Sequence, residues 1–139
     1  MTGFQVPLTF DASAQQNPPP VRLLLADDSR SVRQGICRLL ASSSEIELVG
    51  EAACFREMLE LAESLTPRVV LMDLHMRDDR EYTPHQVRSA LNHACRLVAM
   101  SLWNDQPAKS LAQSFGAVAL LDKASLNETL VLAIARLGR

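Results

Sequence analysis

The sequence predicts a doubly wound α/β fold, in which a parallel sheet is covered by helices on both faces. From Val21 onward, short apolar runs alternate five times with segments whose apolar residues recur at helical spacing. Four of the five runs are apolar throughout, which is typical of parallel strands that are buried on both faces. The connections are short, as in folds built from repeated strand–helix units. Ligands bind to such sheets beyond the carboxyl ends of the strands.

The first half of the domain is predicted to hold three strands and two helices. VRLLLA (21–26) is an apolar run too short for a stable helix, and Ser29 can cap the helix that follows it. The apolar positions of that helix are Val32, Ile36, Leu39 and Leu40. The next strand is marked by Ile46, Leu48 and Val49. The second helix carries the stripe Phe55, Met58, Leu59, Ala62 and Leu65. Pro67 lies just past its end, and the third strand follows at 69–72.

The second half is predicted to repeat the alternation twice more, after a third helix. That helix is marked by Val87, Leu91 and Ala94, with Pro84 suited to its first turn. The fourth strand is predicted at 97–100 and the fifth at 118–121, with Gly116 ending the helix between them. The stripe of this fourth helix is Ala108, Leu111, Ala112 and Phe115. The last helix carries Leu126, Leu130, Ile134 and Leu137, with Ser125 as its expected cap.

The length of 139 residues predicts one domain. Residues 1–20 show no sustained period and end in three prolines, so we expect a flexible N-terminal tail followed by a domain over 21–139. The formal net charge of -2 offers no basic field for nucleic acid. No apolar run approaches the ~20 residues that span a bilayer, and no secretory signal is visible. Three cysteines without metal-ligand spacing fit a reducing compartment. We therefore expect a cytoplasmic domain that binds neither nucleic acid nor membrane.

Polar side chains stand where four of the predicted strands end. Asp27 and Asp28 follow the first strand, Asp73 the third, Ser101 the fourth, and Lys123 lies two residues beyond the fifth. Because parallel strands end at one edge of the sheet, these groups should converge there. Clustered carboxylates raise one another's pKa values unless a cation neutralises them, and oxygen ligands of this kind suit Mg²⁺. A carboxylate held beside a cation, a hydroxyl and an ammonium group can act as the nucleophile in phosphoryl transfer.

This set of residues resembles the receiver domain of two-component response regulators, over about Val21 to Leu137. The motif set is an acidic pair after the first strand, DLHM (73–76) after the third, Ser101 after the fourth and Lys123 after the fifth. The segments LVGEAACFREMLELAESLTPRVVLMDLHM and SFGAVALLDKASLNETLVLAIARL are most similar to the LuxR/NarL-type subclass. The resemblance implies a flavodoxin-like sheet with five strands in the order 2-1-3-4-5 and five helices.

The resemblance also assigns a role to each site residue. Asp73 would be the phosphoacceptor, and the domain would switch its conformation or partner binding when phosphorylated. Asp28 and Asp73 would bind Mg²⁺ directly, Asp27 mainly through water, and His75 through its backbone carbonyl. Ser101 would hydrogen-bond the phosphoryl group and Lys123 would pair with it. The phosphoryl source would be a histidine kinase or a small phosphodonor, and a homodimer or a downstream protein would be a further partner.

The sequence departs from the family pattern at four places. The glycine expected a few residues after DLHM is missing from RDDREYTPHQ (77–86). Arg77 stands where a proline usually follows DLHM, Leu102 follows the hydroxyl residue where a small side chain is common, and Leu120 occupies the place of the switch aromatic. We expect Leu102 to narrow access to the site. We expect the acids of the loop after DLHM to form a solvated surface and not a second metal site; they are Asp78, Asp79 and Glu81.

Two other functions remain open at this point. The departures favour a receiver-like interaction module that is not controlled by phosphorylation, whereas the complete set of site residues argues against it. A Mg²⁺-dependent phosphatase with an aspartyl nucleophile is the enzyme alternative. Such enzymes usually place a second acid two residues after the nucleophile, where this chain has His75. We therefore predict a phosphoacceptor and not an enzyme of the ordinary kind. Trp103 is interpreted either as a partner-facing aromatic or as a shield for the site.

Overall fold

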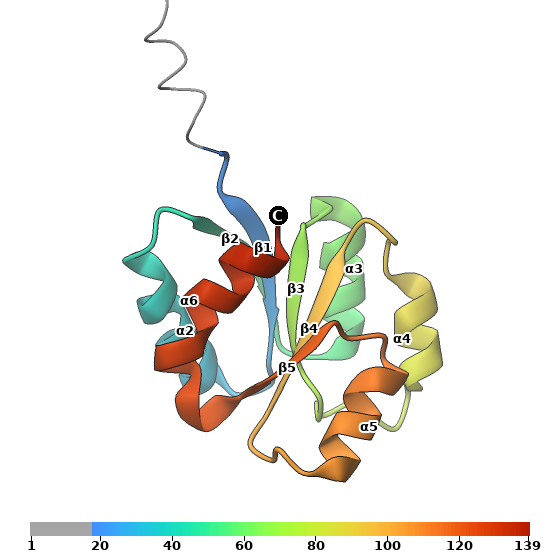
Figure 1. Cartoon of the computed structure of the whole chain (residues 1–139). Helices are drawn as coiled ribbons and strands as arrows, with labels where there is room; N and C mark the ends of the chain where they lie inside the picture. The colour runs from blue at the N-terminus through green and yellow to red at the C-terminus, as the bar shows by residue number, and fades with distance from the viewer. Residues whose placement is uncertain (1–17) are drawn as a thin grey trace, which may run out of the picture.

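The computed structural model describes residues 18–139 and shows five parallel strands in the order β2-β1-β3-β4-β5 (Figure 1). The strands are β1 (Val21–Ala26), β2 (Ile46–Ala52), β3 (Val69–Asp73), β4 (Arg96–Ser101) and β5 (Ala119–Asp122). The doubly wound fold and its strand order are therefore confirmed. Every strand-to-strand connection runs through at least one helix, so all carboxyl ends of the strands lie at one edge of the sheet, the lower edge in Figure 1.

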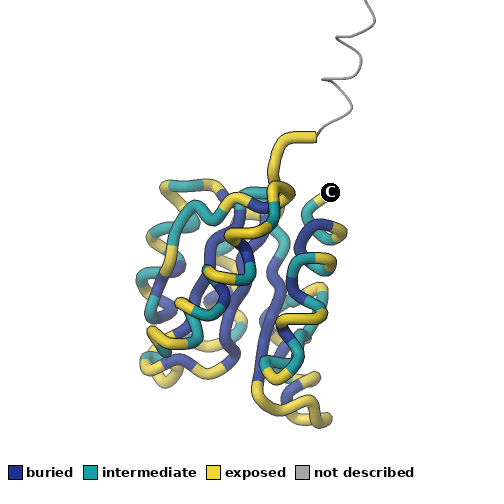
Figure 2. Tube along the Cα trace, turned by 90° about the vertical axis from the view of Figure 1, so that its left-hand side faces the viewer, coloured by how far each residue is buried: buried dark blue, intermediate teal, exposed yellow. Residues whose placement is uncertain are grey.

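Helices cover both faces of this sheet. One face carries α2 (Arg30–Ala41) and α6 (Leu126–Leu137), and the other carries α3 (Phe55–Leu65), α4 (Pro84–Ala90) and α5 (Gln106–Ser114). Successive residues of a strand point to opposite faces, so Leu23 and Leu25 pack toward α2 and α6 while Leu24 packs toward α3. Figure 2 shows the central strands as buried segments between helices whose outer sides are exposed. The predicted burial of the central strands on both faces is thus confirmed.

The residues predicted at the starts of three helices, α2, α4 and α6, all lie there, but not all of them act as caps. The Ser29 hydroxyl accepts a hydrogen bond of 3.3 Å from the backbone N–H of Val32 at the start of α2, as predicted. Pro84 occupies the first turn of α4 behind a Thr83 cap. Ser125 does precede α6, but its side chain makes no capping bond there. The carboxylate of Asp122 instead accepts from Ala124 N and starts a short 3₁₀ turn, η2 (Lys123–Ser125).

Some element boundaries differ from the prediction. The third helix, α4, ends at Ala90 because Leu91 adopts an extended conformation, so Leu91 and Ala94 do not belong to it. β5 begins at Ala119, one residue later than predicted, and is half-buried along its length because it is an edge strand. Gly116 takes a φ of +80° just after α5, a conformation that favours glycine and fits its predicted role at the helix end.

The predicted N-terminal tail falls largely outside the described residues. Of this tail the structure describes Pro18, Pro19 and Pro20, which are exposed and have no regular structure. Among residues 18–139, no helix is long and apolar enough to cross a membrane.

Candidate functional site

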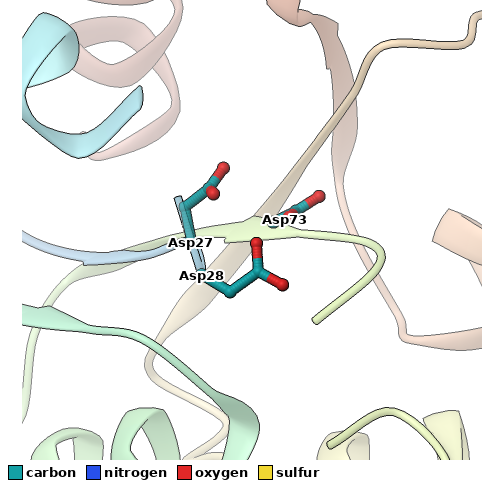
Figure 3. A group of neighbouring side chains, drawn as sticks. All are labelled: Asp27, Asp28 and Asp73. Atoms are coloured by element: carbon teal, nitrogen blue, oxygen red, sulfur yellow. The ribbon is translucent and has the colours of Figure 1, made fainter. Parts of the chain in front are cut away.

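Three carboxylates meet at the carboxyl edge of the sheet, from the ends of two neighbouring strands. Asp73 is the last residue of β3, and the pairing of Ala26 with Met72 brings the residues after β1 beside it. Each of Asp27, Asp28 and Asp73 offers an oxygen atom within 4.8 Å of the others (Figure 3). Asp27 is fully buried, Asp73 is 6% exposed and Asp28 is exposed to solvent. The cluster therefore has a buried base and an open side.

Lys123 reaches this cluster from the end of the edge strand β5. Its Nζ atom lies 2.7 Å from Oδ2 of Asp27 and 3.3 Å from Oδ1 of Asp73. Lys123 is the first residue of the η2 turn, and the Asp122 carboxylate fixes that turn where β5 ends. The single ammonium group offsets part of the charge of the three acids and leaves a net negative site.

Burial and charge together perturb the ionisation of two groups. Desolvation first, and then the negative charge of Asp27, raise the pKa of Asp73 from 3.8 to about 6, although Lys123 opposes this. Burial lowers the pKa of Lys123, but its hydrogen bond to Asp27 and the charge of Asp73 outweigh burial and raise that pKa overall. Lys123 is therefore a fixed positive charge, and Asp73 is an ionisable carboxylate that a further cation would stabilise in its charged form.

The donor set fits a small hard cation. All three ligand side chains are carboxylates, which suits Mg²⁺, and no imidazole or thiolate ligand joins them among the described residues. The backbone of the predicted fourth ligand is held at the same place, because His75 N–H donates to Oδ1 of Asp73 at 3.3 Å. The three acids of the implied ligand set therefore lie together, and their binding of Mg²⁺ stays a prediction.

Ser101 ends β4 next to this group and is 1% exposed. Its hydroxyl oxygen accepts a 3.0 Å hydrogen bond from the backbone N–H of Trp103, so the hydroxyl hydrogen remains available for another acceptor. Ser101, Asp73 and Lys123 line the same pocket of about 620 Å³. The structure thus brings all the predicted site residues together.

The rim of the pocket carries two rings. His75 and Trp103 face each other edge to face, with centroids 6.1 Å apart, and both line the pocket. Trp103 is 58% exposed and Leu102 is 65% exposed, which shows that the loop after β4 leaves large apolar surface in solvent. The pocket continues along an apolar wall that includes Ile36 of α2 and Leu126 of α6.

The contacts of two charged residues near the site were missed by the sequence analysis. Arg33 on α2 donates from Nη1 to the backbone carbonyl of Asp27 at 2.6 Å and forms an ion pair with Glu51. Asp79 and Glu81 are exposed, as predicted for a solvated surface, but that prediction is wrong for Asp78, which is half-buried. Its carboxylate accepts hydrogen bonds from the backbone N–H groups at the start of α3. A lone charged residue is most often solvated, so neither role left a signal in the sequence.

Comparison with known proteins identifies the class that this fold and site define. The family model described as response regulator receiver domain matches residues 23–135, and the chain therefore belongs to that family. It is 33% identical over 116 residues to the response regulator GacA of Pseudomonas aeruginosa, covering 82% of this chain and 53% of GacA. It is 42% identical over 60 residues to the nitrate/nitrite response regulator NarL of Escherichia coli K12, covering 43% of this chain and 28% of NarL.

Solved structures give the same result. The signal receiver domain of a putative response regulator NarL from Mycobacterium tuberculosis matches with a TM-score of 0.76 and 28% identity, covering 87% of this chain and 98% of that one. A LuxR-family response regulator from an Aurantimonas species matches with a TM-score of 0.74 and 29% identity, covering 86% and 85%. The resemblance to LuxR/NarL-type receivers is confirmed. The chain spans about half the length of GacA and less of NarL.

Proposed function

We propose that this receiver domain accepts a phosphoryl group on Asp73 in a Mg²⁺-dependent reaction and thereby changes its conformation or its partner binding. The observation that carries the proposal is the position of the Asp73 carboxylate. It is held at the floor of a pocket, 3.3 Å from the Lys123 ammonium and within 4.8 Å of two further acids. A carboxylate that is buried and held beside an ammonium group is suited to attack the phosphorus atom of a phosphodonor that enters the pocket from solvent.

The residues around Asp73 would divide the work of the transfer. An oxygen of Asp73 forms a bond to phosphorus while the bond from phosphorus to the donor's leaving group breaks and that group takes the electron pair. The Ser101 hydroxyl would donate to a phosphoryl oxygen. The Lys123 ammonium, which now pairs with Asp73, would form an ion pair with a phosphoryl oxygen after the transfer. Preorganised donors of this kind stabilise charge that develops in the transition state.

The cation would be held by Asp28 and Asp73 directly, by the backbone carbonyl of His75, and by Asp27 through water. When bound, Mg²⁺ supplies positive charge to the phosphoryl oxygens and so lowers the repulsion between the phosphodonor and the acids. The 2.7 Å ion pair between Asp27 and Lys123 supports this division of roles. It engages one oxygen of Asp27 and leaves the exposed Asp28 as the freer ligand.

As a member of its family, the domain belongs to two-component signalling. We propose a histidine kinase or a small phosphodonor as the source of the phosphoryl group, and a second copy of the chain or a downstream protein as the partner that reads the change. We further propose that the receiver domain extends over 21–139 and works in the cytoplasm.

The proposal is tested by incubating the protein with acetyl phosphate and Mg²⁺ and measuring the intact mass. Wild type should gain one phosphoryl group, and both Asp73→Asn and wild type in EDTA should gain none. Equal labelling of the wild type and the Asp73→Asn variant would falsify the assignment of Asp73.

A second candidate function is a constitutive interaction module, which the Leu120 side chain favours. Leu120 packs with the core under α3 to α5 and offers no aromatic ring that could move between two positions. Beryllofluoride, a mimic of the phosphoryl group, separates the two functions. A receiver under phosphoryl control should show changed amide hydrogen exchange around β4 and β5 when it is added with Mg²⁺, and a constitutive module should not.

A further inference from the structure

The start of α3 is capped by a residue from another part of the chain. The N-cap residue Cys54 makes no side-chain hydrogen bond to the helix. Instead, the two oxygens of the Asp78 carboxylate accept from the backbone N–H groups of Phe55 at 2.9 Å and Arg56 at 3.1 Å. The carboxylate satisfies two of the free N–H groups of the first turn and opposes the positive end of the helix dipole. Asp78 therefore joins two segments that are more than twenty residues apart in the chain.

Asp78 lies in the loop that carries part of the phosphoryl site. This β3–α4 loop (residues 74–83) begins directly after Asp73 and contains His75. At its first residue, Leu74 N–H donates to the carbonyl of Met100 at 3.2 Å. A tight turn follows, in which Asp79 N–H donates to the carbonyl of Met76, and Asp78 then fastens the loop to α3.

The helix to which Asp78 is fastened is a rigid support. Phe55 and Met58 of α3 are fully buried, and Phe55 stacks on Phe115 with ring centroids 5.7 Å apart. The loop segment between Leu74 and Asp78 is only three residues long, and in it His75 and Arg77 are exposed while Met76 is buried. The position of the His75 backbone is therefore set by β3 on one side and by the Asp78 cap on the other.

We infer that Asp78 is a positioning residue for the phosphoryl site, which holds the β3–α4 loop against α3 and so fixes the backbone of His75 beside Asp73. The inference rests on the proposed function, in which the His75 carbonyl binds Mg²⁺. This role of Asp78 also explains how the loop can be held in place with Arg77 where the family usually has a proline. A proline at that position would restrain the loop by its fixed φ angle, and here the bidentate cap of Asp78 supplies the restraint.

The chain offers matched controls for this role. Asp79→Ala removes a neighbouring exposed carboxylate and tests whether charge alone matters, because it changes the net charge as much as Asp78→Ala does. Glu57→Ala removes the carboxylate that accepts from Ala53 N–H at 2.8 Å, just before the start of α3, without altering the β3–α4 loop. It tests whether any weakening of the start of α3 is enough to reduce Mg²⁺ affinity. Asp78→Asn should restore only part of the function, because its amide oxygen can accept from one of the two N–H groups, whereas its NH₂ group cannot accept from the other.

The experiment measures Mg²⁺ affinity by calorimetry and amide hydrogen exchange in the metal-free protein, at a temperature where every variant is folded. Asp78→Ala should weaken Mg²⁺ binding about tenfold, as the loss of a residue that orients a metal ligand does. It should also speed exchange at His75 as well as at Phe55 and Arg56. Asp79→Ala and Glu57→Ala should bind Mg²⁺ as wild type does, and Asp78→Asn should lie between Asp78→Ala and wild type.

Several results would overturn the inference. Unchanged Mg²⁺ affinity and His75 exchange in Asp78→Ala would reduce Asp78 to a helix cap, and an equal loss in Glu57→Ala would show that helix stability alone is responsible. An equal loss in Asp79→Ala would assign the effect to long-range charge. Failure of the proposed function looks different, because wild type itself would then neither bind Mg²⁺ nor take up a phosphoryl group. In that case the exchange of His75 still decides whether Asp78 holds the loop.

Discussion

Replacing Asp73 by Asn should make the metal-free protein more stable at neutral pH, although it removes the proposed phosphoacceptor. The reason is that Asp73 is 6% exposed and its carboxylate stands beside that of Asp27. Burial and the charge of Asp27 raise the pKa of Asp73 from 3.8 to about 6. Ionised Asp73 is therefore less favourable in the folded state than in the unfolded state, and Asn has nearly the same shape without the charge.

The size of the effect follows from the pKa shift. A shift of about two pKa units corresponds to roughly 3 kcal/mol at about 1.4 kcal/mol per unit. The attraction of Lys123 is already part of that shift, because it lowers the pKa of Asp73. Asn also leaves Lys123 with one fewer anion and packs imperfectly, so we expect a net gain of roughly 1–3 kcal/mol in the free energy of unfolding.

The pH dependence gives this prediction its sign. Because the folded-state pKa is raised, the folded protein holds the proton more tightly than the unfolded chain does. The cost of ionising Asp73 is absent below the unfolded value of 3.8, grows as the pH rises toward about 6, and is complete above it. Wild type should therefore lose stability relative to Asp73→Asn across this interval.

Urea unfolding in EDTA, followed by circular dichroism at about pH 4.5 and about pH 8, measures the difference between the two proteins. The advantage of Asp73→Asn should be large at the higher pH and small at the lower one. Adding Mg²⁺ at about pH 8 should stabilise wild type much more than the variant. A variant that is no more stable than wild type at about pH 8, or equally favoured at both pH values, would refute the electrostatic account of the cluster.

Further predictions concern the metal, the rim and the response to phosphorylation. Asp28→Ala should weaken Mg²⁺ binding strongly and Asp27→Ala less so, because Asp27 is proposed to act through water, and a calorimetric titration that finds equal affinities in Asp28→Ala and wild type would reject this ligand set. The fluorescence of Trp103, the single tryptophan, should shift when Mg²⁺ and beryllofluoride are added, since its backbone N–H donates to the hydroxyl oxygen of Ser101. Trp103→Ala should shorten the lifetime of the phosphorylated protein if the ring shields the site, and an unchanged lifetime with constant wild-type fluorescence would leave Trp103 a partner-facing residue. Self-association, where beryllofluoride induces it, should use a helical face and raise the mass measured by light scattering, and a constant mass would favour the constitutive module.

The fold was predictable because both of its signals are local. The apolar runs and helical stripes predicted the five strands and the five α-helices, and the Ser29 cap of α2 and the Pro84 residue in the first turn of α4 were visible in the sequence. The errors lie where tertiary contacts decide. The end of α4 at Ala90 depends on the turn after it. The apolar stripe through Leu91 and Ala94 predicted a longer helix because it carries no information about that turn.

The cluster at the carboxyl edge was predictable because topology alone brings strand ends together. In the structure the Lys123 ammonium lies within ion-pair distance of both Asp27 and Asp73, as predicted from the positions of these residues at the strand ends. The supports of the site were not predictable. Arg33 bonds a backbone carbonyl and Asp78 bonds backbone N–H groups of a distant helix. Such contacts depend on where loops run in space, and the side chains involved look the same in sequence as solvated charges.

The most direct test of the central claim locates the phosphoryl group in the chain. Protein treated with acetyl phosphate and Mg²⁺ is reduced with borohydride, which converts an aspartyl phosphate to homoserine, and is then digested and analysed by mass spectrometry. Our account predicts homoserine at position 73 only, and none when Mg²⁺ is omitted. Homoserine at position 27 or 28, or phosphoryl uptake that does not need Mg²⁺, would contradict the account.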